Sequence, residues 1–213
     1  MTRRRRAAVF LMVCGLTVCG LGAVAAGWLT WSMTRARPDD AGSLPAGVHR
    51  AVSGDAREAS APVRVHGPAG LDAAVVPVAA RADGDLALPS DPRTGGWWSL
   101  GAQAGAPAGT VLIAGHVDSR RGGLGPFAAL HETPVGADVT VTGADAEVRR
   151  YRVTARRTYR REKLPTDLFA RTGPHRLALL TCAGPYDRGS GRYARNLVLY
   201  AAPRPGRLPR PGH

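Results

Sequence analysis

The chain has 213 residues, 44% of them hydrophobic and 21% charged, which is ordinary for a globular protein and allows one medium-sized domain with an additional segment. Its formal net charge of +13 is high enough to attract nucleic acid or an anionic surface. However, Lys163 is the only lysine, the arginines are scattered among Ala, Gly and Pro, and no motif combines basic with aromatic residues. We therefore expect no nucleic-acid partner.

The first 34 residues predict a membrane anchor in the form of an N-terminal transmembrane helix. Residues 7–34 carry no charge, and about 20 apolar residues are enough to cross a bilayer. Trp28 and Trp31 stand where interfacial aromatic residues are found. The arginine cluster at 3–6 outweighs the basic residues that follow, so the positive-inside rule places the N-terminus in the cytoplasm. We expect a single-pass plasma-membrane protein whose remaining residues are extracellular.

Two other interpretations of this segment stay open. Residues 23–25, with the sequence AVA, would suit cleavage of a signal peptide, although the apolar run is longer than in a typical signal. Cys19 would suit a lipoprotein signal, but Val18 stands before it, where a small residue is expected. The membrane anchor is the interpretation that we retain.

Composition divides the rest of the chain into three parts. Residues 35–61 are rich in Pro, Gly, Ala, Ser and charge and have no lasting periodicity, which predicts a flexible extracellular stalk. A folded domain is expected over residues 62–203, and a disordered tail over 204–213. The function must therefore lie in the middle part.

Short β-branched runs, separated by Gly and Pro, predict a mostly β domain. The expected strands lie at 63–65, 74–78, 110–114, 139–142, 148–154, 177–181 and 197–201. Helical signals are brief, at 127–130 and 166–170. This spacing predicts a closed or nearly closed β-barrel with short connecting helices.

Cys182 is the first candidate for chemistry. It follows the apolar run at 177–181 and precedes a turn containing Gly184 and Pro185. Because the other cysteines, Cys14 and Cys19, lie in the predicted anchor, Cys182 has no disulfide partner in the exported domain. An unpaired cysteine of this kind indicates a reactive thiol. The alternative is a buried structural cysteine that packs as a small apolar residue.

A reactive thiol needs a nearby base, and His116 is the histidine that best suits this role. It ends the run TVLIAGH, where a buried strand gives way to a glycine-rich loop, just as Cys182 ends its own strand. The alternative for His116 is a core histidine with satisfied hydrogen bonds. The other histidines fall in the stalk (His49), the tail (His213), beside turns (His66 and His175) and, as we expect, on the surface after residues 127–130 (His131).

An arginine on the last predicted strand would complete a site for acyl transfer. Such chemistry needs a donor for the oxyanion, and Arg195 stands at the start of that strand, with Arg192 close by. The alternative is a solvated surface arginine, in a chain that has many.

The motifs IAGHVDS, LLTC and RYARNLVLYA, behind an N-terminal anchor, resemble those of the sortases, the cysteine transpeptidases of Gram-positive cell surfaces. The GHVDS and NLVLYA segments, and the segment DGDLALPSDPRTGGWW, look most like the class F sortases of actinobacteria. The resemblance covers about residues 62–203 and implies an eight-stranded sortase β-barrel.

The resemblance also implies roles for individual residues. Cys182 would form a thioester with the substrate, His116 would act as acid and base, and Arg195 would steady the oxyanion. In the best-known sortases the arginine directly opens the last strand, whereas here Asn196 holds that place and Arg195 precedes it, so Arg192 stays an alternative. We also assign Thr181, Asn196 and Asp118 to substrate binding, although Asp118 equally suits a turn cap.

The expected partners follow from the same resemblance. They are surface proteins with a Leu-Pro-x-Thr-Gly-like sorting signal, and a peptidoglycan-precursor or pilin amine as the acceptor. No cofactor is implied, and no carboxylate cluster in the sequence suggests calcium or another metal.

Two alternatives to this function stay open. The first is another cell-wall cysteine peptidase or transpeptidase, but the Ser-His-Gly-Cys type of motif is absent, and Cys182 follows a strand late in the chain rather than opening a helix early. The second is a non-catalytic anchored binding domain with an inert thiol.

Overall fold

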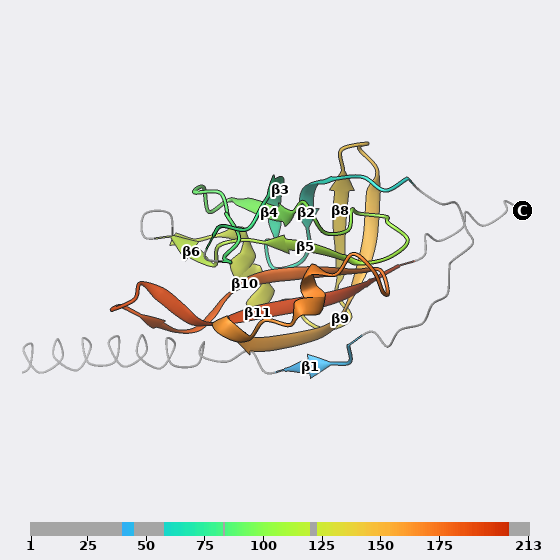
Figure 1. Cartoon of the computed structure of the whole chain (residues 1–213). Coiled ribbons are helices and arrows are strands. Elements are labelled where there is room, and N and C mark those ends of the chain that lie inside the picture. Colours follow the sequence, from blue (N-terminus) through green and yellow to red (C-terminus); the bar gives the residue numbers. More distant parts are fainter. Residues whose placement is uncertain (1–39, 45–57, 83, 120–122, 205–213) are drawn as a thin grey trace, which may run out of the picture. The chain divides into compact units, whose positions relative to one another are not determined.

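The computed structural model describes residues 40–44, 58–82, 84–119 and 123–204 (Figure 1). The strands are β1 (Ala41–Gly42), β2 (Pro62–His66), β3 (Asp72–Val78), β4 (Thr94–Trp98), β5 (Thr110–Ala114), β6 (Asp118–Ser119), β7 (Gly123–Leu124), β8 (Asp138–Gly143), β9 (Val148–Arg160), β10 (Arg176–Asp187) and β11 (Arg192–Pro203). Three short 3₁₀ helices are η1 (Pro126–His131), η2 (Arg161–Lys163) and η3 (Thr166–Phe169).

Eight strands form a closed β-barrel in the order β9-β11-β10-β5-β4-β3-β2-β8, and β8 pairs with β9 to close it. Most neighbours are antiparallel, but β5 runs parallel to β10 and β3 runs parallel to β4. Figure 1 shows the long strands β9, β10 and β11 side by side. The predicted mostly β, eight-stranded barrel is confirmed.

Alternating side chains of the central strands pack on two sides of the barrel wall. Leu177, Leu179, Leu197 and Leu199 belong to the interior core. Their neighbours in the sequence, such as Leu180 and Val198, belong to an outer cluster that is covered by side chains of η3 and of residues 86–88. This two-residue period is the pattern expected for a strand that is buried on both faces. It also fixes the face on which each side chain near the site lies.

The apolar runs predict most strands but not their full lengths. β5 has the predicted bounds, whereas β9, β10 and β11 continue for several residues beyond the runs at 148–154, 177–181 and 197–201. These extensions are polar, so hydrophobicity does not mark them, and they are held by the backbone ladders between β9 and β11 and between β10 and β11. They form the part of the barrel that carries the candidate site.

Strand β4 is absent from the sequence-based prediction because its sequence, TGGWW, contains two glycines, which disfavour strands. Both glycines are required by packing. A Cβ atom on Gly95 would lie 2.8 Å from the ring of Phe127, and one on Gly96 would lie 2.9 Å from the side chains of Leu88 and Val78. The strand therefore forms where the Phe127 ring and the side chains of Leu88 and Val78 approach its backbone closely.

The brief helical signals at 127–130 and 166–170 are confirmed as η1 and η3. Phe127 and Leu130 of η1 are buried in the interior core, and Leu168 of η3 is buried in the outer cluster. Each helix thus packs one or two apolar side chains against the barrel wall.

Part of the predicted flexible stalk is ordered, which corrects the prediction for those residues. Gly42 of β1 pairs with Ala155 of β9, and the Arg157 guanidinium donates hydrogen bonds to the carbonyls of Ala41 and Gly42 at 2.6 and 2.7 Å. Asp40 accepts a hydrogen bond from the Thr158 N–H at 2.8 Å. Backbone pairing needs no apolar side chains, so the composition of this segment does not predict it.

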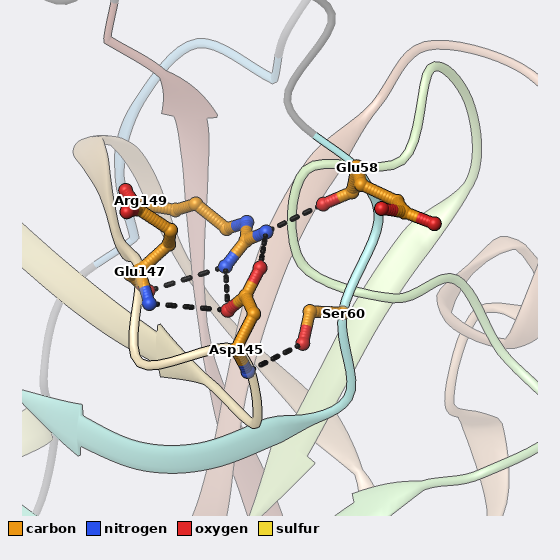
Figure 2. Close-up of polar contacts among 5 residues, drawn as sticks. All are labelled: Glu58, Ser60, Asp145, Glu147 and Arg149. Carbon is orange, nitrogen blue, oxygen red and sulfur yellow. Dashed lines mark hydrogen bonds and ion pairs between the residues drawn. The ribbon is translucent and has the colours of Figure 1, made fainter.

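A second ordered part of that region is held by a buried arginine at the start of β9 (Figure 2). The side chain of Arg149 is 5% exposed and makes two hydrogen bonds to the Asp145 carboxylate, at 2.6 and 2.9 Å. It also donates to the carbonyls of Glu58 at 2.5 Å and Glu147 at 3.2 Å, while the Ser60 hydroxyl accepts from the Asp145 N–H. The arginine therefore ties residues 58–60 to the β8–β9 turn.

The predicted anchor at 1–34 and nearly all of the predicted tail at 204–213 lie outside the described residues. Within the described ranges, none of the helices has both the length and the apolar character needed to cross a membrane.

Candidate active site

One cleft of the described barrel brings together Cys182 and His116. It has a volume of about 300 Å³, and its walls include His116, Asp118, Arg161, Cys182, Arg192 and Tyr193. His116 follows β5, Asp118 lies in β6, and Arg161 lies in η2. Cys182 lies within β10, and Arg192 and Tyr193 begin β11. The cleft therefore lies where the polar extensions of the strands leave the core.

The parallel pairing of β5 and β10 explains why the two candidate groups meet. The last residue of β5, Ala114, pairs with Leu180 of β10. β10 continues to Asp187, which corrects the prediction for Cys182: it lies within the strand and not at its end. Gly115, the residue after Ala114, donates its N–H to the Leu180 carbonyl at 3.0 Å, and its own carbonyl accepts from the Thr181 hydroxyl at 2.8 Å. The residues that immediately precede His116 and Cys182 are thus bonded directly to each other.

Gly115 has a specific packing role beside His116. A Cβ atom at this position would lie 2.1 Å from the ring of Phe127, which is buried beneath it. Gly125 likewise approaches the backbone carbonyl of His116, at 2.7 Å from the position of an added Cβ. The loop carrying His116 is therefore fixed against η1 by close backbone packing.

Cys182 is a free cysteine and is partly buried. Burial raises the pKa of its thiol above the ordinary value, while the positive charge of Arg161 acts in the opposite direction. The negative charges of Asp118 and Asp85 add to the increase. The protonated thiol is therefore favoured at neutral pH, and ionisation depends on positive charge supplied within the cleft.

His116 is held in one orientation. Its Nε2 lies 3.0 Å from the Pro89 carbonyl oxygen, and because a carbonyl only accepts, Nε2 carries the hydrogen. In the neutral ring, Nδ1 is then the basic atom. The hydrogen bond fixes the tautomer and the ring plane, as a side chain that exchanges protons requires.

A second histidine reaches Cys182 through the backbone, which corrects the prediction that His131 is exposed. His131 ends η1 and is partly buried, and its Nε2 donates to the carbonyl oxygen of Cys182 at 3.1 Å. His131 therefore supports the position of the cysteine from the side of η1.

The residues predicted to bind substrate occupy three different environments. Thr181 is fully buried with its hydroxyl on the Gly115 carbonyl, which corrects its assignment: it joins β10 to β5 and does not face a substrate. Asp118, in β6, accepts a 2.6 Å hydrogen bond from the Tyr193 hydroxyl, so it joins the β6–β7 hairpin to β11. Asn196 is 6% exposed and lies directly opposite Cys182 on β11.

Arg195 is not among the residues that line the cleft. It pairs with Ala183, one residue beyond Cys182, and its aliphatic carbons lie beside Gly184. Arg192, the alternative from the sequence, does line the cleft. The described residues include no group of three His, Cys, Asp or Glu side chains placed to hold a metal ion.

The comparison with protein-family models decides the identity of this barrel. A model of the sortase domain matches residues 69–204. The chain belongs to the sortase family. Sortases are cysteine transpeptidases, so the family agrees with a cleft built around one free cysteine and a histidine.

Solved sortases share the fold of this sortase. Streptococcus agalactiae sortase C1, in complex with MTSET, matches with a TM-score of 0.51 and 18% identity over 67% of this chain and 68% of that chain. Corynebacterium diphtheriae sortase A matches with a TM-score of 0.51 and 18% identity over 71% of this chain and 64% of that chain. No curated protein sequence matches this sortase.

The sequence analysis missed three residues of this site: Arg161 and Tyr193, which line the cleft, and His131, which donates to the Cys182 carbonyl. Arg161 stands in an arginine-rich stretch, where no pattern distinguishes it from its neighbours. Tyr193 lies on a strand extension that the apolar run does not predict. His131 had a usable signal, since it directly follows the buried Phe127 and Leu130 of η1.

Proposed function

We propose that this sortase cleaves a C-terminal sorting signal through a thioester on Cys182 and transfers the attached protein to an amine. The observation that carries the proposal is the cleft that Cys182 and His116 share, with His116 just after the end of β5 and Cys182 within β10, the parallel strand bonded directly to β5. This arrangement gives the nucleophile and the base rigid supports and an open approach for a peptide.

The first half of the proposed reaction forms the acyl-enzyme. His116 takes the proton of the Cys182 thiol, and the thiolate attacks the carbonyl carbon of the scissile peptide bond, which gives a tetrahedral oxyanion. The oxyanion collapses as the C–N bond breaks, and protonated His116 gives its proton to the leaving amine. A thioester on Cys182 and a neutral His116 result.

The second half transfers the acyl group. The amino group of the acceptor attacks the thioester carbonyl and loses a proton to His116. The C–S bond then breaks, an amide bond remains on the product, and Cys182 recovers the proton. His116 thus acts as acid in one half and as base in the other, which is why one histidine with a basic Nδ1 suffices.

The substrate class that we propose is a signal of the Leu-Pro-x-Thr-Gly type, cut between Thr and Gly. The acceptor is an amine of a peptidoglycan precursor or of a pilin. This proposal rests on the resemblance of GHVDS, NLVLYA and DGDLALPSDPRTGGWW to class F sortases.

We further propose that residues 1–34 anchor this sortase in the plasma membrane with the barrel outside the cell. Both substrates would then be present at the same membrane face, and tethering raises the local concentration of the reacting partners. The support is the uncharged run at 7–34 behind the arginine cluster.

The test is a transpeptidation assay with the full-length protein, a library of sorting-signal peptides and an amine acceptor, read by mass spectrometry. The wild-type protein should join the acyl part of one peptide class to the acceptor, and Cys182→Ala should not. Equal product formation by Cys182→Ala would contradict the proposed function. Hydrolysis without transfer would restrict the function to that of a peptidase.

A further inference from the structure

The carbonyl group of Cys182 lies beyond the end of the ladder between β5 and β10. Carbonyls two residues apart along a strand point to the same neighbouring strand, and the Leu180 carbonyl accepts from the Gly115 N–H on the β5 side. The Cys182 carbonyl therefore also points to the β5 side. However, β5 ends at Ala114, and its ladder with β10 ends at Leu180. The strand that supports the first half of β10 thus stops before it reaches the Cys182 carbonyl.

The pairing of β10 with β11 is also interrupted close to Cys182. Cys182 lies opposite Asn196, and the register shifts between Ala183 and Tyr186. Gly184, inside this interruption, has a φ of +78°, which is left-handed backbone rather than extended strand. The peptide unit after Cys182 therefore lies where the ladders on both sides of β10 are broken, and support for it must come from outside the sheet.

His131 provides this support. Its Nε2 lies 3.1 Å from the Cys182 carbonyl oxygen, and because a carbonyl only accepts, Nε2 is the donor. The imidazole thus satisfies the carbonyl in the way that a backbone N–H would if β5 were longer. A partly buried carbonyl without a donor is unfavourable, so this hydrogen bond favours one position of the peptide unit.

The helix η1 holds His131 firmly. Phe127 and Leu130 of η1 are fully buried in the interior core. The hydroxyl of the buried Thr133 donates to the Ala129 carbonyl at 2.8 Å, which secures the end of the helix. A donor on such a rigid support can fix the group that it contacts.

The same helix also contacts the backbone that carries His116. The Phe127 ring packs so closely against Gly115 that a Cβ atom has no room there. Helix η1 therefore touches the backbone before His116 through Phe127, and the backbone of Cys182 through His131. One rigid element is thus in contact with the supports of both the base and the nucleophile.

We propose that His131 is a positioning residue for the Cys182 thiol, acting through the hydrogen bond from its Nε2 to the Cys182 carbonyl. The proposal rests on the proposed function, in which His116 must reach the thiol to take its proton. His131 is not among the residues that line the cleft, so we expect it to touch neither the substrate nor the reacting atoms. Its loss should therefore lower kcat and leave KM nearly unchanged.

The first experiment observes this hydrogen bond directly and needs no substrate. The full-length protein is labelled with ¹³C at the cysteine carbonyls and with ¹⁵N in alanine. Cys182 and Ala183 form the only Cys–Ala pair of the chain, because Cys14 and Cys19 precede glycines, so a ¹⁵N–¹³C correlation NMR spectrum contains one signal. Loss of a hydrogen bond moves a carbonyl ¹³C resonance to lower frequency, and His131→Leu should show this shift. An unshifted resonance would overturn the proposal.

The second experiment measures turnover with the peptide identified in the transpeptidation assay. His131→Leu should lower kcat by about 10- to 100-fold with little change in KM, because misplacing a reacting group by about 1 Å can cost about 100-fold. Unchanged kcat in His131→Leu would contradict the positioning role.

Two amide variants test whether the reach of the donor matters. His131→Gln places an amide N–H near the position of Nε2, so it should recover most of kcat and the wild-type ¹³C resonance. His131→Asn carries the same amide on a side chain that is shorter by one methylene group, so it should recover neither. Equal kcat values in the two variants would overturn the proposal, and this comparison decides it even where His131→Leu does not fold.

Thr133→Val is the matched control for a purely structural effect. It removes a buried hydrogen bond at the end of η1 and keeps His131, so it should lower stability while kcat and the ¹³C resonance of the folded protein stay near the wild-type values. A loss of kcat as large as in His131→Leu would overturn the proposal, because helix packing would then explain both. If the wild-type protein transfers no peptide, the proposed function fails, whereas an unshifted resonance in His131→Leu overturns the role of His131 by itself.

Discussion

One arginine lies near the start of strand β9 and another lies just after its end, and the two differ in burial and in hydrogen-bond partners. Arg149, at the start, is 5% exposed, and its guanidinium is bonded to the Asp145 carboxylate and to the Glu58 and Glu147 carbonyls. Arg161, just after the end, is 25% exposed and is bonded to Asp85 at the rim of the cleft. The Arg149 side chain is enclosed by its partners, whereas the Arg161 side chain remains partly exposed.

The comparison of Arg149 with Arg161 shows that a charged side chain can either hold chain segments together or remain accessible in a cleft. The two terminal nitrogens of Arg149 donate to one carboxylate and two carbonyls and so join chain segments, and its Nε is buried without a partner among the described residues, out of reach of a ligand (Figure 2). Arg161, held by one carboxylate in the wall of the cleft, is positioned yet still accessible. Variants of Arg149 should therefore change stability, whereas variants of the cleft residues His116 and Cys182 should change turnover.

After Cys182→Ala, the largest effect is expected for His116→Ala. It removes the group that we assign to both proton transfers, and such catalysis typically contributes about 10²–10⁴-fold to the rate. Transpeptidation kinetics should show kcat lowered by that factor, while thermal unfolding should stay close to that of the wild type.

His66→Ala is the matched control for this variant, because His66 lies on β2 with its side chain 66% exposed. It should leave kcat unchanged. Comparable losses in the two variants would show that His116 is not the base.

Gly115→Ala should affect both stability and turnover, since Gly115 lies between the core and the site. The added methyl group would overlap the Phe127 ring, and overpacking of this kind typically costs about 1–3 kcal/mol of unfolding free energy. The backbone shift should also separate His116 from Cys182, so kcat should fall. Urea unfolding and kinetics on the same protein check both effects; a stable but inactive variant would also show that the Gly115 backbone positions the site.

Arg149→Met should lower the unfolding free energy by roughly 2–3 kcal/mol, because it removes a buried guanidinium and leaves the carbonyls of Glu58 and Glu147 and the partly exposed Asp145 carboxylate without this donor. At temperatures where the variant is folded, kcat should stay at the wild-type value. A loss of turnover in the folded variant would contradict the division between the two ends of β9.

The ion pair of Arg149 with Asp145 should make the stability of the protein depend on pH. Its hydrogen bond to Arg149 holds the pKa of the Asp145 carboxyl well below the ordinary value of 3.8. A lowered pKa in the folded state contributes stability above about pH 4, and the contribution is lost as the pH falls below that value. Asp145→Asn should therefore be less stable than the wild type at pH 7, and the gap should close in acid. The gap should narrow progressively as the pH falls from 4 toward 2, and a gap as large at pH 2 as at pH 4 would contradict the ion-pair account.

The smallest effect is expected for Gly42→Ala. Gly42 has a φ of +75°, and an added Cβ would lie 2.1 Å from the Thr154 carbonyl oxygen, so β1 should detach from β9. Because the barrel is closed without β1, its stability and kcat should change little. Hydrogen exchange should become faster at the Thr158 N–H, which donates a hydrogen bond to the Asp40 carboxylate. The control variant Ala41→Gly should leave this exchange rate nearly unchanged. Continued protection of Thr158 in Gly42→Ala would contradict the pairing.

Sequence analysis predicts the apolar half of the barrel better than the polar half. β5 and the first residues of β10 are continuous apolar runs, so their burial and the end of β5 just before His116 follow from composition, whereas the polar continuation of β10 past Cys182 does not. β4 and β1 escape prediction because close backbone approach at Gly95, Gly96 and Gly42 creates them. Arg161 and Asp85 meet only in the folded chain, 76 residues apart, and no local pattern marks such a pair.

The most direct test of the account is the mass of the enzyme during reaction. The full-length protein is incubated with the reactive sorting-signal peptide without an acceptor amine, quenched in acid, digested and analysed by mass spectrometry. The account predicts an acyl adduct on the peptide that contains Cys182, released by hydroxylamine as a thioester is, and absent from Cys182→Ala. An adduct on another residue, or cleavage of the sorting signal by Cys182→Ala at the wild-type rate, would contradict it.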